Sequence, residues 1–154
     1  METVSPLGRL SAAPGSWSER RPGHFSRSKS NCSPLARQML ASWNVEGLGA
    51  EYYKLEQIIF LMAQRNISIL CMQETQCKGL QHFMQNGFLI ILSGVVEESC
   101  GRANAGVGFI VAPWAIGSII GFTLFSDRLS MLRVRVSGGS LNLITAYAPH
   151  NGHK

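Results

Sequence analysis

The chain has 154 residues, enough for one domain with a sizeable hydrophobic core. Hydrophobic residues make up 45% of it and charged residues 15%, which excludes a chain that is disordered throughout. The net charge is +5, from 14 Lys and Arg against 9 Asp and Glu. Residues 1–37 hold six of the basic residues and two of the acidic ones, so the rest is nearly neutral. The overall charge is therefore weak evidence for a nucleic-acid surface.

Residues 1–37 differ in composition from the rest of the chain, with four of the six prolines, eight serines and scattered arginines. Such a segment cannot bury enough apolar surface to offset its ordering entropy. We therefore predict a disordered, dispensable basic tail over 1–37 and a folded domain over 38–154. A transit peptide is an alternative for the tail, because it is rich in Arg and Ser, but its prolines and the lack of an amphipathic helical pattern argue against one.

The four cysteines do not form a zinc or disulfide framework, because Cys71 and Cys77 stand six residues apart. The chain shows no secretory signal, so we predict free, buried thiols in a reducing compartment. We therefore expect an intracellular chain, nuclear or cytoplasmic, although the sequence does not identify the compartment.

The folded part begins with a strand–helix–strand pattern. An apolar run over 39–45 predicts a strand, and apolar residues at spacings of three and four predict an amphipathic helix over 51–65. Residues 67–72 are apolar at successive positions, which is typical of a strand buried on both faces.

Shorter elements come next along the chain. We predict a helical turn over 79–85 and a strand over 88–92. Two further strands, 107–111 and 118–125, flank a turn at Pro113 and Trp114. A Gly-Gly pair at 138–139 separates an alternating run from a second apolar run and predicts a hairpin over 132–147.

One stretch permits a rival interpretation. Residues 103–126 contain no charged residue, and this uncharged stretch is long enough to span a membrane. Glycines and a proline interrupt the stretch, and its flanks lack a basic cluster or aromatic belt. Buried strands account for it better, so we predict no membrane association.

Two polar residues stand where predicted strands end. Asn44 follows the first strand, and Glu74 follows the strand over 67–72. Ligands of open α/β sheets bind beyond the carboxyl ends of the strands, so these side chains could share one site. A lone carboxylate there suits Mg²⁺, which takes one or two protein carboxylates and completes its shell with phosphate oxygens. The alternative is a turn-capping amide and a merely exposed carboxylate.

Five short motifs occur in order over residues 39–150. They are W-N-V at 43–45, M-Q-E-T at 72–75, G-V-G-F at 106–109, D-R-L at 127–129 and A-Y-A-P at 146–149. Together they resemble the N-terminal half of the endonuclease/exonuclease/phosphatase superfamily. The resemblance is closest to the apurinic-type endonuclease domains of non-LTR retrotransposons, which implies a retrotransposon-derived nuclease domain.

The resemblance implies an α/β fold, the first half of a four-layer sandwich in which two sheets pack face to face between outer helices. We expect only one sheet and its helix to be well represented, which leaves a sheet face uncovered and open to self-association. Asn44 would organise the site, Glu74 would be the principal Mg²⁺ ligand, and Tyr147 would approach the scissile phosphate of DNA. Gly106 and Gly108 would be structural.

The chain also departs from the family. Members often carry a phosphate-binding asparagine directly after the Tyr-x-Pro step, where this chain has His150 followed by Asn151. The family's second half supplies a Gly-Asp-Phe-Asn-type segment and a terminal Asp-His pair. This sequence contains neither, and its single aspartate is Asp127.

We therefore expect a truncated endonuclease-like domain, ancestrally a Mg²⁺-dependent phosphodiesterase on DNA and inactive as this chain. The alternative is a non-catalytic fragment that binds a partner through its exposed sheet face or its basic tail. The sequence leaves open whether the ancestral substrate was DNA, RNA, an inositol phosphate or a lipid head group.

Overall fold

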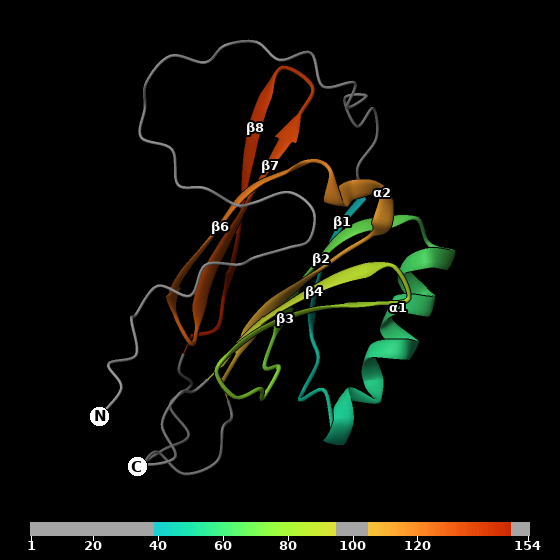
Figure 1. The fold of residues 1–154 in the computed structure, drawn as a ribbon. Helices are drawn as coiled ribbons and strands as arrows, with labels where there is room; N and C mark the ends of the chain where they lie inside the picture. The colour runs from blue at the N-terminus through green and yellow to red at the C-terminus, as the bar shows by residue number, and fades with distance from the viewer. Residues whose placement is uncertain (1–38, 95–104, 149–154) are drawn as a thin grey trace, which may run out of the picture. The chain divides into compact units, whose positions relative to one another are not determined.

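The fold comes from a computed structural model that describes residues 39–94 and 105–148, and these residues belong to one compact unit (Figure 1). The predicted tail over 1–37 and the residues His150 and Asn151 lie outside the described residues. The elements are β1 (Met39–Asn44), the 3-10 helix η1 (Ala50–Tyr52), α1 (Lys54–Gln64), β2 (Ile67–Gln73), β3 (Leu80–Gln85), β4 (Phe88–Ser93), β5 (Val107–Val111), α2 (Pro113–Ile116), β6 (Ile119–Ser126), β7 (Leu129–Val136) and β8 (Gly139–Ala146).

The strands form two sheets. The first has five strands in the order β1-β2-β5-β4-β3, and the second has three in the order β6-β7-β8. β1 and β2 run parallel, because α1 carries the chain back between them, and the other neighbours are antiparallel. The fold is therefore mixed α/β with mostly strands, as the sequence predicts at this coarse level.

Helix α1 covers one face of the five-stranded sheet (Figure 1). Its apolar residues recur at spacings of three and four, so they share one face of the helix. That face packs on Leu70 and Met72 of β2 and on Ile90 and Ile110 of the neighbouring strands. The helix residues buried there are Leu55, Ile58, Ile59 and Met62.

The second sheet covers the opposite face of the first. Because side chains alternate along a strand, Ile69 of β2 and Phe109 of β5 point away from α1. They pack with Leu132 and Val134 of β7 in a separate core cluster, and all four are nearly inaccessible to solvent. The expectation that the second sheet would be poorly represented is therefore wrong. In the described residues, α1 covers one face of the first sheet and the second sheet covers the other, so the predicted uncovered face is absent there.

The helical turn predicted over 79–85 is also wrong, because this segment is strand β3. It pairs along its whole length with β4. The turn between them is Asn86-Gly87, and both residues have positive φ, 50° and 80°. This dipeptide is a strong signal for a tight hairpin turn, and it favours two strands over a helical turn.

The remaining element predictions are confirmed within a few residues. The predicted turn at Pro113 and Trp114 is the short helix α2, and Ser137 and Gly138 form the hairpin turn between β7 and β8. Residues 105–126 form β5, α2 and β6. In the described part of the chain, no helix has the length and apolar character that crossing a bilayer would need.

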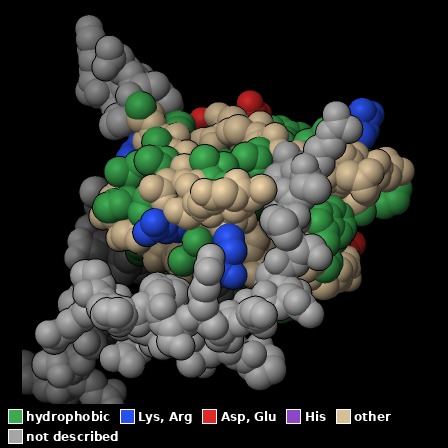
Figure 2. All heavy atoms as spheres, turned by 90° about the horizontal axis from the view of Figure 1, so that it is seen from above, with side chains coloured by type: hydrophobic (Ala, Val, Ile, Leu, Met, Phe, Trp, Pro, Cys, Tyr) green, Lys and Arg blue, Asp and Glu red, His purple; other side chains and the backbone are tan. Residues whose placement is uncertain are grey.

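The two core clusters leave several large apolar side chains in contact with solvent. They lie mainly on β1, on the outer side of α1 and on the second sheet. Figure 2 shows one face of the molecule on which hydrophobic side chains are spread among a few Lys and Arg. The surface therefore offers apolar contacts to other molecules.

The packing between the sheets predicts a specific loss of stability. Phe109 is fully buried and meets Phe122 of β6 edge to face, with ring centroids 6.3 Å apart. We expect Phe109→Ala to lower the free energy of unfolding by about 3–5 kcal/mol, because it leaves a cavity between the sheets. Phe125→Ala, at a side chain that is 57% exposed, is the control and should change it by about 0.5 kcal/mol or less. Equal losses in urea titrations of the two variants would contradict the described packing.

Candidate functional site

The parallel pairing of β1 and β2 brings the two predicted strand-end residues together. Asn44 is aligned with Gln73, so its side chain lies beside Glu74, the next residue. The Asn44 amide Nδ2 donates a hydrogen bond of 2.7 Å to Glu74 Oε1. Asn44 Oδ1 in turn accepts a bond of 3.1 Å from the backbone N–H of Glu46. Glu74 Oε1 and Asn44 Oδ1 are thus each oriented by a hydrogen-bond donor.

Tyr147 completes the group from the second sheet. It follows β8 directly, and its hydroxyl lies close enough to the Glu74 carboxylate to be affected by its charge. Partial burial, and then the neighbouring Glu74 charge, raise the pKa of Tyr147 above its usual value, while the Arg128 guanidinium acts in the opposite direction. The phenol therefore stays protonated at neutral pH and is available as a hydrogen-bond donor.

Arg128 is a member of the site that the sequence reasoning did not assign. Its guanidinium carbon lies 5.4 Å from the centre of the Tyr147 ring, within the range of a cation–π contact. The Tyr147 backbone N–H donates to the Arg128 carbonyl at 2.9 Å, which fixes the two residues side by side. The D-R-L motif at 127–129 marked this position, but only the pairing of β7 with β8 shows that it reaches Tyr147.

A second layer of hydrogen bonds ties the two sheets together beneath the site. The Gln73 amide Nε2 donates to Thr145 Oγ1 of β8 at 3.0 Å and to Ser42 Oγ of β1 at 3.1 Å. The buried Thr145 hydroxyl donates to the Met72 carbonyl at 2.9 Å. This network joins β1, β2 and β8, so the three strand ends that carry the site are held in register.

The loop that carries Glu74 is held from both sides. The backbone N–H groups of Thr75 and Gln76 donate to Gly106 and Ala105, each at 3.0 Å. Glu74 itself has a positive φ of 54°, a conformation that a non-glycine residue adopts only where its surroundings impose it. Gly106 has φ 115°, and a Cβ there would lie 2.3 Å from Thr75 Oγ1. The close packing expected at Gly106 is therefore present, and it fixes the direction of Glu74.

The donor set fits a weakly held hard cation. Glu74 is half-buried and offers one carboxylate, which accepts a hydrogen bond from the amide nitrogen of Asn44. Across residues 39–94 and 105–148, no group of three or more His, Cys, Asp or Glu side chains is close enough to share a metal ion. Mg²⁺ completes its shell with waters and substrate phosphate oxygens, so one carboxylate is sufficient for that mode of binding. These residues alone provide too few ligands for a tight, preformed metal site.

The thiols in the described part of the chain do not contribute chemistry. Cys71 and Cys77 are free cysteines, as predicted, and Cys77 is buried. Burial raises the pKa of the Cys71 thiol to about 11, so it stays protonated and unreactive at neutral pH. The site therefore consists of an amide, a carboxylate, a phenol and a guanidinium.

A scan of the chain against protein-family models found no match, and a search of the curated proteins found none either.

The contact between Glu74 and Tyr147 predicts a titration shift. We expect Glu74→Gln to lower the pKa of Tyr147, because it removes the negative charge that opposes formation of the phenolate. NMR of tyrosines labelled with ¹³C at the hydroxyl-bearing carbon measures this pKa, and Tyr147→Phe identifies the signal. Glu56→Gln, at an exposed position in the first turn of α1, is the control and should leave the pKa unchanged. An unaltered Tyr147 titration in Glu74→Gln would refute the contact.

The packing of Gly106 predicts a backbone effect. Gly106→Ala should lower the free energy of unfolding by at least about 1–3 kcal/mol, because it combines a positive φ with a clash against Thr75. Gly121→Ala is the matched control, since a Cβ there has no atom within 4 Å and the backbone needs no positive φ. Urea unfolding compares the two. A Gly106→Ala protein as stable as Gly121→Ala would show that the Glu74 loop is not held as described.

Proposed function

We propose that residues 39–148 belong to an endonuclease/exonuclease/phosphatase-like domain and carry part of a Mg²⁺-dependent phosphodiesterase site, ancestrally for DNA. One observation carries the proposal. Asn44, Glu74 and Tyr147 were each expected at such a site, although up to 103 positions separate them. The fold brings them into one group, because Asn44 is hydrogen-bonded to Glu74 and the Glu74 charge acts on Tyr147. A group of capping or surface residues has no reason to converge in this way.

Each side chain has a role that follows from its chemistry. Glu74 holds the cation, whose charge neutralises a phosphate oxygen when it is bound. Asn44 keeps the Glu74 carboxylate oriented through its 2.7 Å hydrogen bond. The protonated Tyr147 hydroxyl donates to a phosphate oxygen, and Arg128 adds a positive charge on the same side. Together these groups bind and orient a phosphodiester.

The groups that would activate water are missing from this sequence. Hydrolysis needs a general base near the attacking water, and general acid–base help contributes about 10²–10⁴-fold to the rate. Asp127 is the single aspartate of the 154 residues. His82 lies on β3, at the opposite edge of the five-stranded sheet from β1 and hence from Asn44. We therefore propose that these 154 residues are inactive on their own.

The arrangement of layers supports the same proposal. The layers follow one another in the order helix α1, five-stranded sheet and second sheet. This order is compatible with three successive layers of a four-layer α/β sandwich. We propose that the chain represents the first half of this sandwich.

Metal binding tests the proposal without requiring activity. Mn²⁺ substitutes for Mg²⁺ and broadens the NMR signals of nearby nuclei. We expect millimolar Mn²⁺ to broaden the Asn44 side-chain amide and the Tyr147 ring signals first, because both contact Glu74. Glu74→Gln should abolish the preferential broadening of these two signals, while Glu56→Gln should preserve it. Broadening that is the same in wild type and Glu74→Gln would remove Glu74 as the metal ligand and end the proposal.

A cleavage assay tests the inactivity. The purified chain should not cut abasic or plasmid DNA in the presence of Mg²⁺, since the described residues provide no general base at the site. A fragment with the family's second half, added in trans, should restore cleavage that depends on Glu74. Cleavage by the unaided chain would contradict the inactivity, whereas reconstituted cleavage that survives Glu74→Gln would contradict the assigned role.

A further inference from the structure

Strand β1 is one of the two edges of the first sheet, and β3 is the other. β1 pairs with β2 on one side, and no described strand pairs with its other side. Unpaired edges of this kind usually carry charges, prolines or bulges that prevent pairing with another chain. Residues Met39–Asn44 contain no charged residue and no proline. The pairing of β1 with β2 has one register shift, between Met39 and Leu40, whereas the edge β6 of the second sheet has two.

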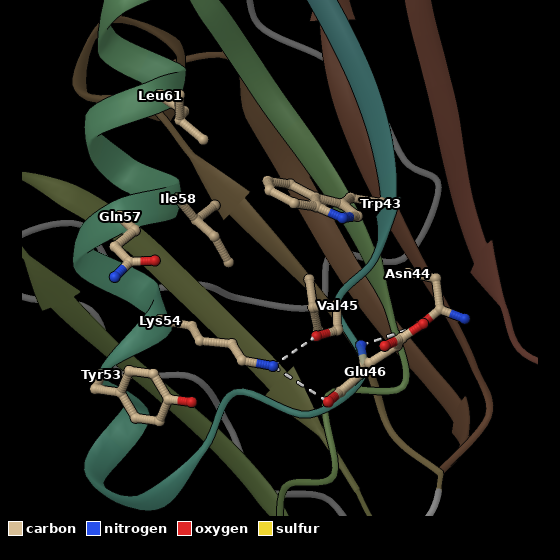
Figure 3. A pocket seen from close by; sticks show the side chains of 9 residues that line it. All are labelled: Trp43, Asn44, Val45, Glu46, Tyr53, Lys54, Gln57, Ile58 and Leu61. Carbon is tan, nitrogen blue, oxygen red and sulfur yellow. Dashed lines mark hydrogen bonds between the residues drawn. The ribbon is translucent and has the colours of Figure 1, made fainter.

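A pocket of about 520 Å³, lined by both polar and apolar side chains, lies beside this edge (Figure 3). The Trp43 ring points into it from β1, toward Ile58 and Leu61 of α1. Its one lysine is already engaged, since the Lys54 amino group donates to the carbonyls of Val45 and Glu46 at 3.2 and 3.3 Å. The pocket therefore has an apolar wall next to unpaired backbone groups.

The pattern of β1 is self-complementary. Met39 and Trp43 are 53% and 46% exposed, and they lie on the α1 side of the sheet together with the small Ala41 midway between them. Rotation by a two-fold axis through Ala41, perpendicular to the sheet, places Met39 of one copy opposite Trp43 of the other. Large side chains then meet large ones at both ends, as an isologous interface requires.

The backbone groups are also correctly directed. The Val45 N–H donates to the Gln73 carbonyl at 3.0 Å, so the odd-numbered residues of β1 turn their backbone groups toward β2. The groups of Leu40 and Ser42 therefore point outward, where an antiparallel partner strand would bind them. Ala41 then falls in a pair without mutual hydrogen bonds, in which the two Cα atoms are about 4.5 Å apart.

We propose that β1 is a homodimer interface, in which two copies of this chain pair antiparallel through β1 and join their five-stranded sheets. Trp43 of each copy packs against Met39 of the other, next to Leu61 of its own α1. The uncharged edge brings no like charges together across the axis. This assembly does not depend on what Glu74 binds.

Sedimentation equilibrium of the full chain tests the interface. The wild type should form a dimer, and Trp43→Lys should raise the dimer dissociation constant by at least about tenfold, because it places a charge in the apolar contact. Ile144→Lys is the control, since Ile144 is 61% exposed on the outer face of the second sheet. A monomer at every concentration would overturn the proposal. An equal rise of the dimer dissociation constant in Ile144→Lys and Trp43→Lys would also overturn it.

Cross-linking tests the register and does not rely on loss of association. Under mild oxidation, Ala41→Cys should give a disulfide-linked dimer, because the predicted Cα separation lies within disulfide range. Ser42→Cys, on the opposite face of the same strand, should not. Mass spectrometry of tryptic peptides distinguishes a 41–41 link from links through the native cysteines. Linking at Ser42→Cys but not at Ala41→Cys, or at neither position, would overturn the proposed pairing.

Discussion

The burial of β2 on both faces is the constraint on which the rest of the structure depends. Leu70 and Met72 anchor α1, while Ile69 packs against the second sheet. No other packing of this strand keeps all of its apolar side chains out of water, so helix and second sheet are fixed on opposite sides. Glu74 directly follows the same strand, so the position of the candidate site follows from the position of the core.

The polar contacts between the sheets show how the site and the fold share the same atoms. The Thr145 hydroxyl is buried, and a buried hydroxyl without a partner is costly. It bonds to the Met72 carbonyl and to Gln73, so the second sheet can only close on the first in one register. That register places Tyr147 beside Glu74. A change in the closure of the sheets would therefore alter the site before it altered either core cluster.

Local pattern predicts most of the elements, and its failures have identifiable causes. The helix over 51–65 and the strand at 67–72 have strong periodicity, and both are present. β3 resembles a helical turn in sequence because its alternation is between half-exposed side chains, and the Asn86-Gly87 turn is the better signal. Asn44 and Glu74 are found because strand ends mark ligand sites. Arg128 is not found from the sequence, since its place beside Tyr147 depends on the pairing of the β7–β8 hairpin, which no local pattern specifies.

The groups that surround the Glu74 carboxylate determine how strongly the site can bind a cation. One carboxylate oxygen accepts a hydrogen bond from the Asn44 amide, and the Tyr147 hydroxyl lies close to the same carboxylate. A cation that binds here competes with these donors, and it gains the charge of a single side chain in return. Its binding becomes favourable when a phosphate supplies further oxygens and takes over the Tyr147 donor. Metal and phosphodiester should therefore bind cooperatively, because each frees or supplies groups that the other needs.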